Sequence, residues 1–242
     1  MGHEVRLARR TGPGIAIDRG GILPSPGGWT VKLDYPMVKA NLVLRSVRPG
    51  VTAGPWRLGV DSHYGAQNVH WSAPVALGTA TGSVQTYTMP KPVEVRGWRV
   101  VVEHVRRTLD WSSDVWEYWD SVVVFTKNAT WLLTGMAAAL PAAQAREDDR
   151  AGRTWRGVLA RTTTRGTTMC RPKVVRTNLS RAMDAFGWLH PGRIVATCPS
   201  LRLGVRMILG PTLLRGSLFT SFNYVSRDGG GLGMQIQYAN PS

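Results

Sequence analysis

The sequence predicts a mainly β protein: an antiparallel sandwich or jelly-roll-like barrel with one inserted helical segment at about residues 129–161. Three observations favour this class. Short runs in which apolar and polar residues alternate recur along much of the chain, as half-buried strands require. Clusters of Gly and Pro separate these runs. The runs do not alternate regularly with helical patterns, so a βαβ fold is not expected.

Residues 1–28 are predicted to form an extended basic arm, followed by a single β-rich domain over 29–242. The arm is rich in Gly and Pro, which favour turns and irregular backbone over regular elements. Its basic residues are Arg6, Arg9, Arg10 and Arg19.

The first half of the domain has the pattern of strands. The strongest run, 93–105, is apolar and β-branched, and Gly97 inside it indicates a bulge. Strands are predicted over 29–34, 38–47, 83–89, 93–105 and 118–125.

The segment 129–161 has the Ala- and Leu-rich composition of a helix. Within this segment, spacings of four, three and three residues separate Arg146, Arg150, Arg153 and Arg156. These spacings place the four arginines along one side of a helix. Pro141 indicates a break between two helices. The apolar run 131–145 also resembles the core of a processed signal, but a helix packed on the core is the preferred interpretation.

Residues 162–242 return to strands and loops, with strands predicted over 193–198, 201–209, 216–225 and 234–238. If the backbone stays regular, Arg202 and Arg206 share one face of their strand.

Charge is concentrated in one stretch of the chain. Residues 150–227 hold 13 Arg and one Lys against a single acid, Asp184, so they carry +13 of the net +15. A field of this size favours an anionic partner, and nucleic acid is the expected one, bound without sequence preference. The predicted nucleic-acid-binding residues are Arg150, Arg153, Arg156, Arg161, Arg165, Arg171, Arg176, Arg202 and Arg206.

An acidic, aromatic cluster occupies residues 110–120. Trp is enriched in the cores of protein interfaces, so this cluster is predicted to contact another copy of the chain. The predicted interface residues are Trp111, Trp116, Glu117 and Trp119. A glycosidase-like pair of carboxylates in the same cluster is the more distant alternative.

No motif for a catalytic nucleophile, a phosphate-binding loop or a zinc site is found in the sequence. Asp61, His63 and His70 are possible metal ligands, but a hydrogen-bonded loop is the default interpretation. The sequence therefore predicts no catalytic residue, no metal and no cofactor. The two cysteines, Cys170 and Cys198, are expected to be free buried thiols, although a bridge between them stays open.

Taken together, these features predict a non-enzymatic structural protein of a virus or phage particle, assembled from copies of itself and found in the virion or the host cell interior. Two alternatives are an RNA-binding component of a ribosome-like assembly and a phage tail or connector protein. Nucleic acid and other copies of the chain are the expected partners, and no membrane partner is expected.

Overall fold

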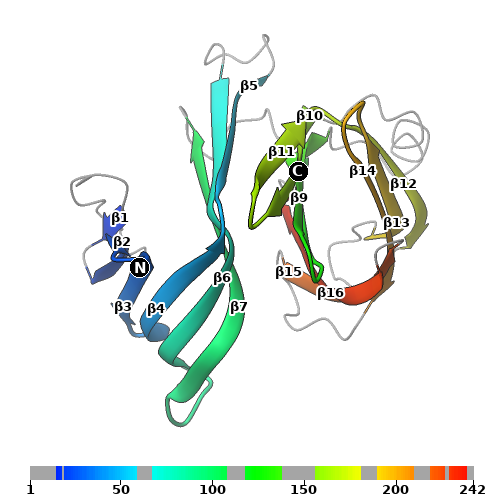
Figure 1. Cartoon of the computed structure of the whole chain (residues 1–242). Helices are drawn as coiled ribbons and strands as arrows, with labels where there is room; N and C mark the ends of the chain where they lie inside the picture. Colours follow the sequence, from blue (N-terminus) through cyan, green and yellow to red (C-terminus); the bar gives the residue numbers. More distant parts are fainter. Residues whose placement is uncertain are drawn as a thin grey trace. The chain divides into compact units, whose positions relative to one another are not determined.

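A computed structural model describes residues 15–17, 19–58, 67–107, 118–137, 156–180, 190–209, 219–226 and 229–238 of the chain (Figure 1). These residues form antiparallel strands, and no helix occurs among them. The strands are β1 (Ile15–Ile17), β2 (Gly20–Ser25), β3 (Gly28–Tyr35), β4 (Val38–Arg48), β5 (Val51–Leu58), β6 (Gln67–Thr86), β7 (Val93–Arg107), β8 (Tyr118–Phe125), β9 (Thr130–Ala137), β10 (Arg156–Thr163), β11 (Gly166–Cys170), β12 (Lys173–Ser180), β13 (His190–Thr197), β14 (Arg202–Leu209), β15 (Phe219–Ser226) and β16 (Gly229–Tyr238).

The strands form two sheets, and the chain divides into two compact units. The seven-stranded sheet has the order β1-β2-β3-β4-β6-β5, with β7 also paired to β6. The first unit comprises residues 1–49 and 75–102, and the second comprises residues 50–74 and 103–242. The division therefore falls inside β6 and β7. The predicted arm (1–28) and single domain (29–242) stay a prediction, although residues 15–17 and 20–25 of that arm lie in strands.

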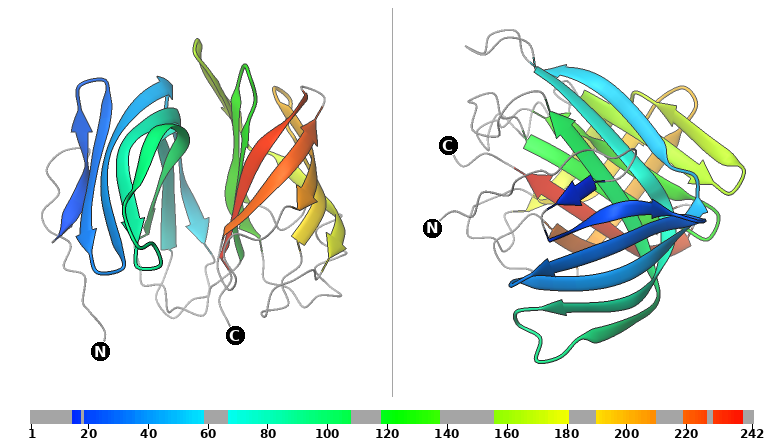
Figure 2. Two further views of the ribbon diagram at one scale, coloured as in Figure 1. Left: turned by 90° about the horizontal axis from the view of Figure 1, so that it is seen from below. Right: turned by 90° about the vertical axis from the view of Figure 1, so that its left-hand side faces the viewer.

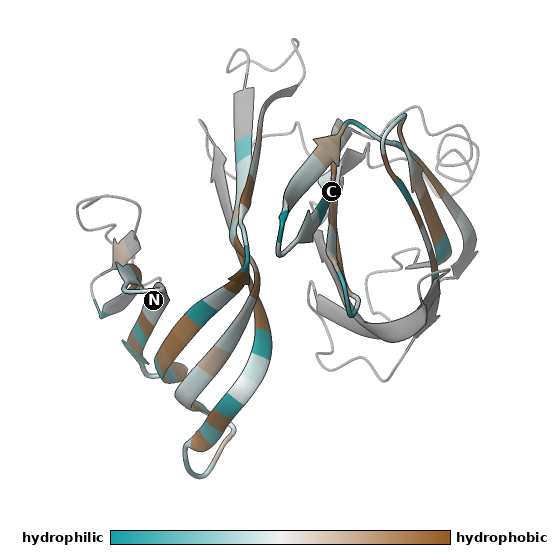
Figure 3. Cartoon of the chain, in the orientation of Figure 1, coloured by the Kyte–Doolittle hydropathy of each residue, from teal (hydrophilic) through white to brown (hydrophobic). Residues whose placement is uncertain are grey.

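The first unit is built on β1 to β4 with the adjoining parts of β6 and β7. Apolar and polar residues alternate along β3 and β4, as Figure 3 shows by colour. The apolar positions gather around Val31, Leu44, Ala80 and Val95, which are buried. Gly97 in β7 has φ of 67°, a left-handed conformation that favours glycine, at the position where the sequence indicated a bulge.

The second unit contains a nine-stranded sheet with the order β11-β10-β9-β8-β16-β15-β14-β13-β12. Almost every strand pairs with its neighbour in the chain, and the last strand, β16, pairs with the first, β8. The two edge strands, β11 and β12, are consecutive and are joined by only Arg171 and Pro172. The sheet curls into a half-barrel, and the gap between its edge strands β11 and β12 is called the barrel seam (Figures 1 and 2).

One face of this sheet encloses an apolar core. Its register sets Val122, Leu133 and Leu159 opposite one another on three adjacent strands, and all three are buried. The core continues across the curled sheet through Val174, Ile194, Ala196, Leu203 and Val205.

The opposite face of β8, β9 and β10 is buried as well. Val123, Leu132 and Ala160 lie on it in one cross-strand row and are almost fully buried. Within the second unit, β5 contacts β10, and Glu103 of β7 contacts Ser121 of β8. Strands that are buried on both faces have near-continuous apolar sequences, because neither face has to be polar.

The helical segment predicted at about 129–161 is not found among the described residues, and the burial of both faces explains why the sequence suggested a helix there. Its described parts are strands β9 and β10, and residues 138–155 lie outside the described residues. Strand β9, Thr130–Ala137, carries apolar residues on both faces, and periodicity alone does not distinguish such a strand from a buried helix. The prediction of a mainly β, antiparallel fold is confirmed.

The expectation of free thiols was wrong. Cys170, at the end of β11, and Cys198, after β13, form a disulfide with a Cα–Cα distance of 6.4 Å. The bridge ties one edge of the barrel seam to the strand beside the other edge. Within the described part of the chain, no helix long and apolar enough to cross a membrane is found.

Candidate proton-transfer site

A buried carboxyl group lies where β7 meets β8 in the second unit. The Ser121 hydroxyl donates a hydrogen bond of 2.9 Å to Oε1 of Glu103. Ser121 is only 1% exposed, whereas Glu103 keeps intermediate exposure. The carboxyl group is therefore buried and held by a buried donor, in a residue that is partly exposed as a whole.

The alternation of β8 explains this geometry. Val122 and Val124 point into the barrel core. Because successive side chains of a strand point to opposite faces, Ser121 and Val123 belong to the outer face. That face is otherwise largely apolar, and Leu132 and Ala160 lie on it close to Val123. A carboxylate at this place loses much of its hydration.

Burial raises the pKa of Glu103 from its ordinary value of 4.5 to about 7, and the hydrogen bond from Ser121 opposes that shift. A carboxyl group with a pKa near 7 populates both the protonated and the charged form at neutral pH. It can therefore donate or accept a proton, as a general acid or base requires.

Further hydroxyl groups lie on the same outer face. Thr134 of β9 is directly opposite Ser121 and is fully buried, and its Oγ1 has no hydrogen-bond partner among the described residues. Thr130 and Thr162, which face each other on β9 and β10, are also fully buried. The largely apolar outer face therefore also carries buried hydroxyl groups, at Ser121, Thr130, Thr134 and Thr162.

Ser121 does not have the geometry of a nucleophile. Its hydroxyl is almost completely buried, and its hydrogen is directed to Glu103. The arrangement suits Ser121 to holding the Glu103 carboxyl group in place.

Sequence reasoning missed Glu103. It is the single acid in the run Val100–Val105, whose other residues are apolar except for His104. The run predicts a strand, and the acid within it belongs to no recognisable motif. A charged residue in a strongly apolar strand is nevertheless a usable signal, because such residues are seldom buried without a partner.

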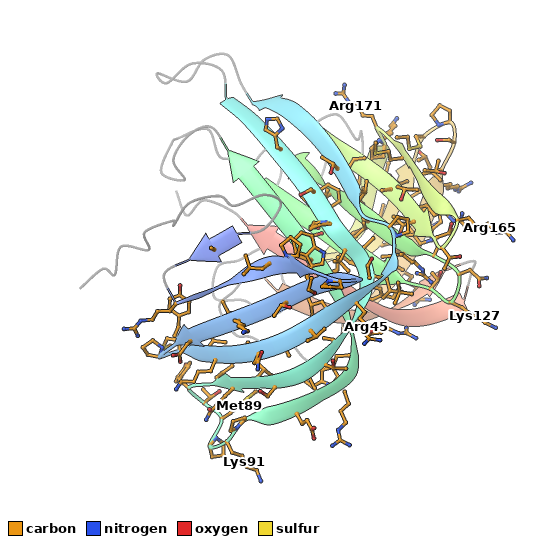
Figure 4. The ribbon with its side chains drawn as sticks, turned by 60° about the vertical axis from the view of Figure 1, so that its left-hand side comes forward. Arg45, Met89, Lys91, Lys127, Arg165 and Arg171 are labelled. Atoms are coloured by element: carbon orange, nitrogen blue, oxygen red, sulfur yellow. A yellow bond between two sulfur atoms is a disulfide. The ribbon has the colours of Figure 1, made fainter. Side chains whose placement is uncertain are left out.

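The predicted nucleic-acid-binding residues are not on one surface. Arg161 lies opposite Trp131 across β10 and β9, and its guanidinium stacks 5.6 Å from the centre of the indole ring, on the side of the barrel core. Arg165 and Arg171 are exposed at turns and project outward (Figure 4). Arg202 and Arg206 are exposed on β14.

The remaining predicted site residues are described only in part. Arg156, Arg176 and Trp119 lie in strands whose pairing is described, and Trp119 is opposite Met136 and Tyr238. The others lie outside the described residues: Arg150, Arg153, Trp111, Trp116 and Glu117. Within the described part of the chain, no group of three or more potential metal ligands is found.

The sequence matches no protein family, and no curated protein matches it. Four chains of solved structures match the fold, two of them as follows. One is a Nitrosomonas europaea protein assigned to AttH, with a TM-score of 0.60 and 9% identity over 93% of this chain and 69% of that protein. The other is kievitone hydratase from Nectria haematococca, with a TM-score of 0.50 and 9% identity over 92% of this chain and 69% of the hydratase. At this identity, the likeness shows the fold alone.

These comparisons correct the functional prediction. The fold is shared with an enzyme and with an AttH-type protein, and neither is a capsid, ribosomal or tail protein. The predictions of a virus- or phage-particle protein, of its two alternatives and of a non-enzyme are therefore wrong. Charge clustering misled the interpretation because net charge bears on binding partners and not on fold.

Proposed function

We propose that the chain is an enzyme that moves a proton to or from a small organic substrate, with Glu103 as the acid–base residue and Ser121 as the residue that positions its carboxyl group. The observation that carries the proposal is the buried Glu103 carboxyl, which accepts a hydrogen bond from Ser121 and has a pKa raised to about 7. A titratable group with a strongly shifted pKa is a recognised marker of a functional site.

Addition of water to a carbon–carbon double bond, or its reverse, is the reaction class that we favour. Its support is the fold shared with an enzyme whose name states that it is a hydratase. The protonated carboxyl group would give its proton to one carbon of the double bond. Water would then add to the other carbon and return a proton to the carboxylate, so that atoms and charge balance and Glu103 is regenerated.

The proposal is tested by incubating the chain with kievitone and a panel of small alkenes in ¹⁸O-labelled water. Mass spectrometry should then show a product that has gained one labelled water, at a rate that depends on a group titrating near pH 7. Glu103→Gln should remove at least about 99% of the rate, as loss of a general acid or base does.

Glu94→Gln is the matched control, because Glu94 is on the same strand, is exposed and pairs with Arg96. The control should keep the full rate. The proposal is overturned if Glu103→Gln turns over substrate as fast as the unchanged chain, or if no compound of the panel is hydrated.

A further inference from the structure

The outer face of β12, β13 and β14 carries a regular array of nine positions in three cross-strand rows. Residues that alternate with these positions point into the barrel core and are buried, including Val174, Ile194 and Leu203. The nine outward positions are therefore fixed by the register. Along successive rows they are Lys173, Thr197 and Arg202, then Val175, Val195 and Gly204, then Thr177, Arg193 and Arg206.

Four of these nine residues are cations, and all four are exposed: Lys173, Arg193, Arg202 and Arg206. None of the nine is acidic. The ion pairs recorded for the described residues, Lys39–Asp34 and Arg96–Glu94, both lie in the first unit. No carboxylate of the described chain therefore neutralises this face.

Arg193 and Arg206 are directly opposite each other on neighbouring strands. Like charges at directly opposed positions destabilise a sheet. An anion that lies across both guanidinium groups would remove that repulsion and gain charge-assisted hydrogen bonds.

The spacing of the cations indicates an anionic polymer. Arg202 and Arg206 are four residues apart on one strand, which places their Cα atoms about 13 Å apart at roughly 3.3 Å per residue. One free phosphate does not span that distance, whereas a chain of phosphates does.

The chemistry between the cations excludes other modes of binding. None of the nine positions is aromatic, so the face has no platform for stacking bases. It also has no large exposed apolar side chain of the kind that anchors a protein in a lipid surface. Its middle row consists of Val175, Val195 and Gly204, which are small.

From these observations we infer that the outer face of β12–β14, named here the cationic grid and defined by Lys173, Arg193, Arg202 and Arg206, binds the sugar–phosphate backbone of nucleic acid without reading its sequence. This site is separate from Glu103 and Ser121 and does not depend on the proposed enzymatic function. It also changes the set of predicted contact residues: Arg161, Arg165 and Arg171 lie outside the grid, and Lys173 and Arg193 are added.

The test uses the full chain and a fluorescently labelled DNA duplex of mixed sequence. Affinity is measured by anisotropy at several salt concentrations. Arg193→Gln with Arg206→Gln should weaken binding and make the plot of log affinity against log salt shallower by roughly 1.8, which is about 0.9 for each phosphate that the variant no longer neutralises.

The matched control is Arg165→Gln with Arg171→Gln, which removes the same charge from exposed positions outside the grid (Figure 4). It should leave the slope unchanged. Lys173→Gln with Arg202→Gln, on the other row, should reproduce the effect of the first pair, and circular dichroism confirms that each variant is folded.

Three results would overturn the inference. One is the absence of DNA binding by the unchanged chain at low salt. Another is equal weakening by the grid pair and the control pair, which would show a general effect of net charge. The third is that the grid variants lose binding to vesicles containing phosphatidylserine but keep their binding to DNA. That result would assign the face to lipid.

Discussion

The hydroxyl of Ser121 and the carboxyl of Glu103 are 2.9 Å apart and join a strand of the seven-stranded sheet to a strand of the nine-stranded sheet within one compact unit. The outer face of β8 is thus polar at the point where β7 reaches it. The pKa of this one carboxyl group, and its effect on stability and activity, can therefore be measured.

The stability of the protein should fall as pH rises from 4.5 to about 7. Because the pKa of Glu103 is higher in the folded than in the unfolded protein, the folded state binds more protons in this window, so the free energy of unfolding decreases with pH. The decrease is expected to be about 1–3 kcal/mol, since Glu103 keeps some contact with solvent. Urea denaturation at a series of pH values measures it.

Glu103→Gln should flatten this pH dependence, because a neutral amide does not titrate. Glu94→Gln provides the control, since Glu94 is exposed and its substitution should leave the slope in this window unchanged. A slope that persists in Glu103→Gln would show that another group is responsible.

Ser121→Ala should raise the pKa of Glu103 further, because the hydrogen bond from Ser121 lowers it. The substitution should also destabilise the charged form of the protein by about 1–2 kcal/mol, as loss of a hydrogen bond to a charged group does. The midpoint of the Glu103 titration and the urea midpoint at pH 8 check the two effects. A pKa that falls in Ser121→Ala would contradict the assignment of the bond.

Thr134→Val should behave in the opposite way to Ser121→Ala. The Thr134 hydroxyl is buried and has no partner among the described residues, so replacing it with a methyl group of similar shape should leave stability unchanged or raise it by about 1 kcal/mol. A loss of more than about 1 kcal/mol in thermal or urea unfolding would mean that this hydroxyl is hydrogen-bonded.

Reduction of the Cys170–Cys198 disulfide should lower the free energy of unfolding by about 3–4 kcal/mol. The bridge closes a loop with a sequence separation of 28, and loop-closure entropy in the unfolded chain gives an effect of that size. Cys170→Ser with Cys198→Ser, compared with the unchanged chain with and without reductant, measures it. If reductant destabilises the double variant as well, the effect does not come from this bridge.

The contact between Arg161 and Trp131 should contribute about 0.5–1 kcal/mol. A double-mutant cycle with Arg161→Gln and Trp131→Leu isolates this coupling from the loss of the indole ring itself. A coupling energy of zero would show that the stacked geometry contributes nothing to stability.

Part of the fold could be predicted because alternation is visible where only one face of a strand is buried. Strands β3 and β4 were predicted close to their observed bounds for this reason. Strand β9 was missed because both its faces are buried, so Trp131 to Ala137 shows no alternation. Strands β5 and β6 were missed in whole or in part because Gly54, Pro55 and Pro74 interrupt their patterns.

The candidate site could not be predicted from the sequence, because it depends on contacts between distant segments. Glu103 and Ser121 are 18 residues apart and become neighbours only when β7 and β8 meet. The cationic residues were recognised in part, since Arg202 and Arg206 were expected to share a face. Arg193 was overlooked because only the register of β13 with β14 places it opposite Arg206.

The pKa of Glu103 is the quantity that tests the central claim most directly. In protein labelled with ¹³C-glutamate, NMR can follow the side-chain carboxyl carbon of Glu103 from about pH 4 to about pH 9, a range that covers ordinary and raised carboxyl pKa values. The variant Glu103→Gln assigns the signal. We predict a midpoint near 7 for this one carboxyl. A midpoint between about 4 and 5, as for an ordinary exposed glutamate, would contradict the assignment of Glu103 as the acid–base residue.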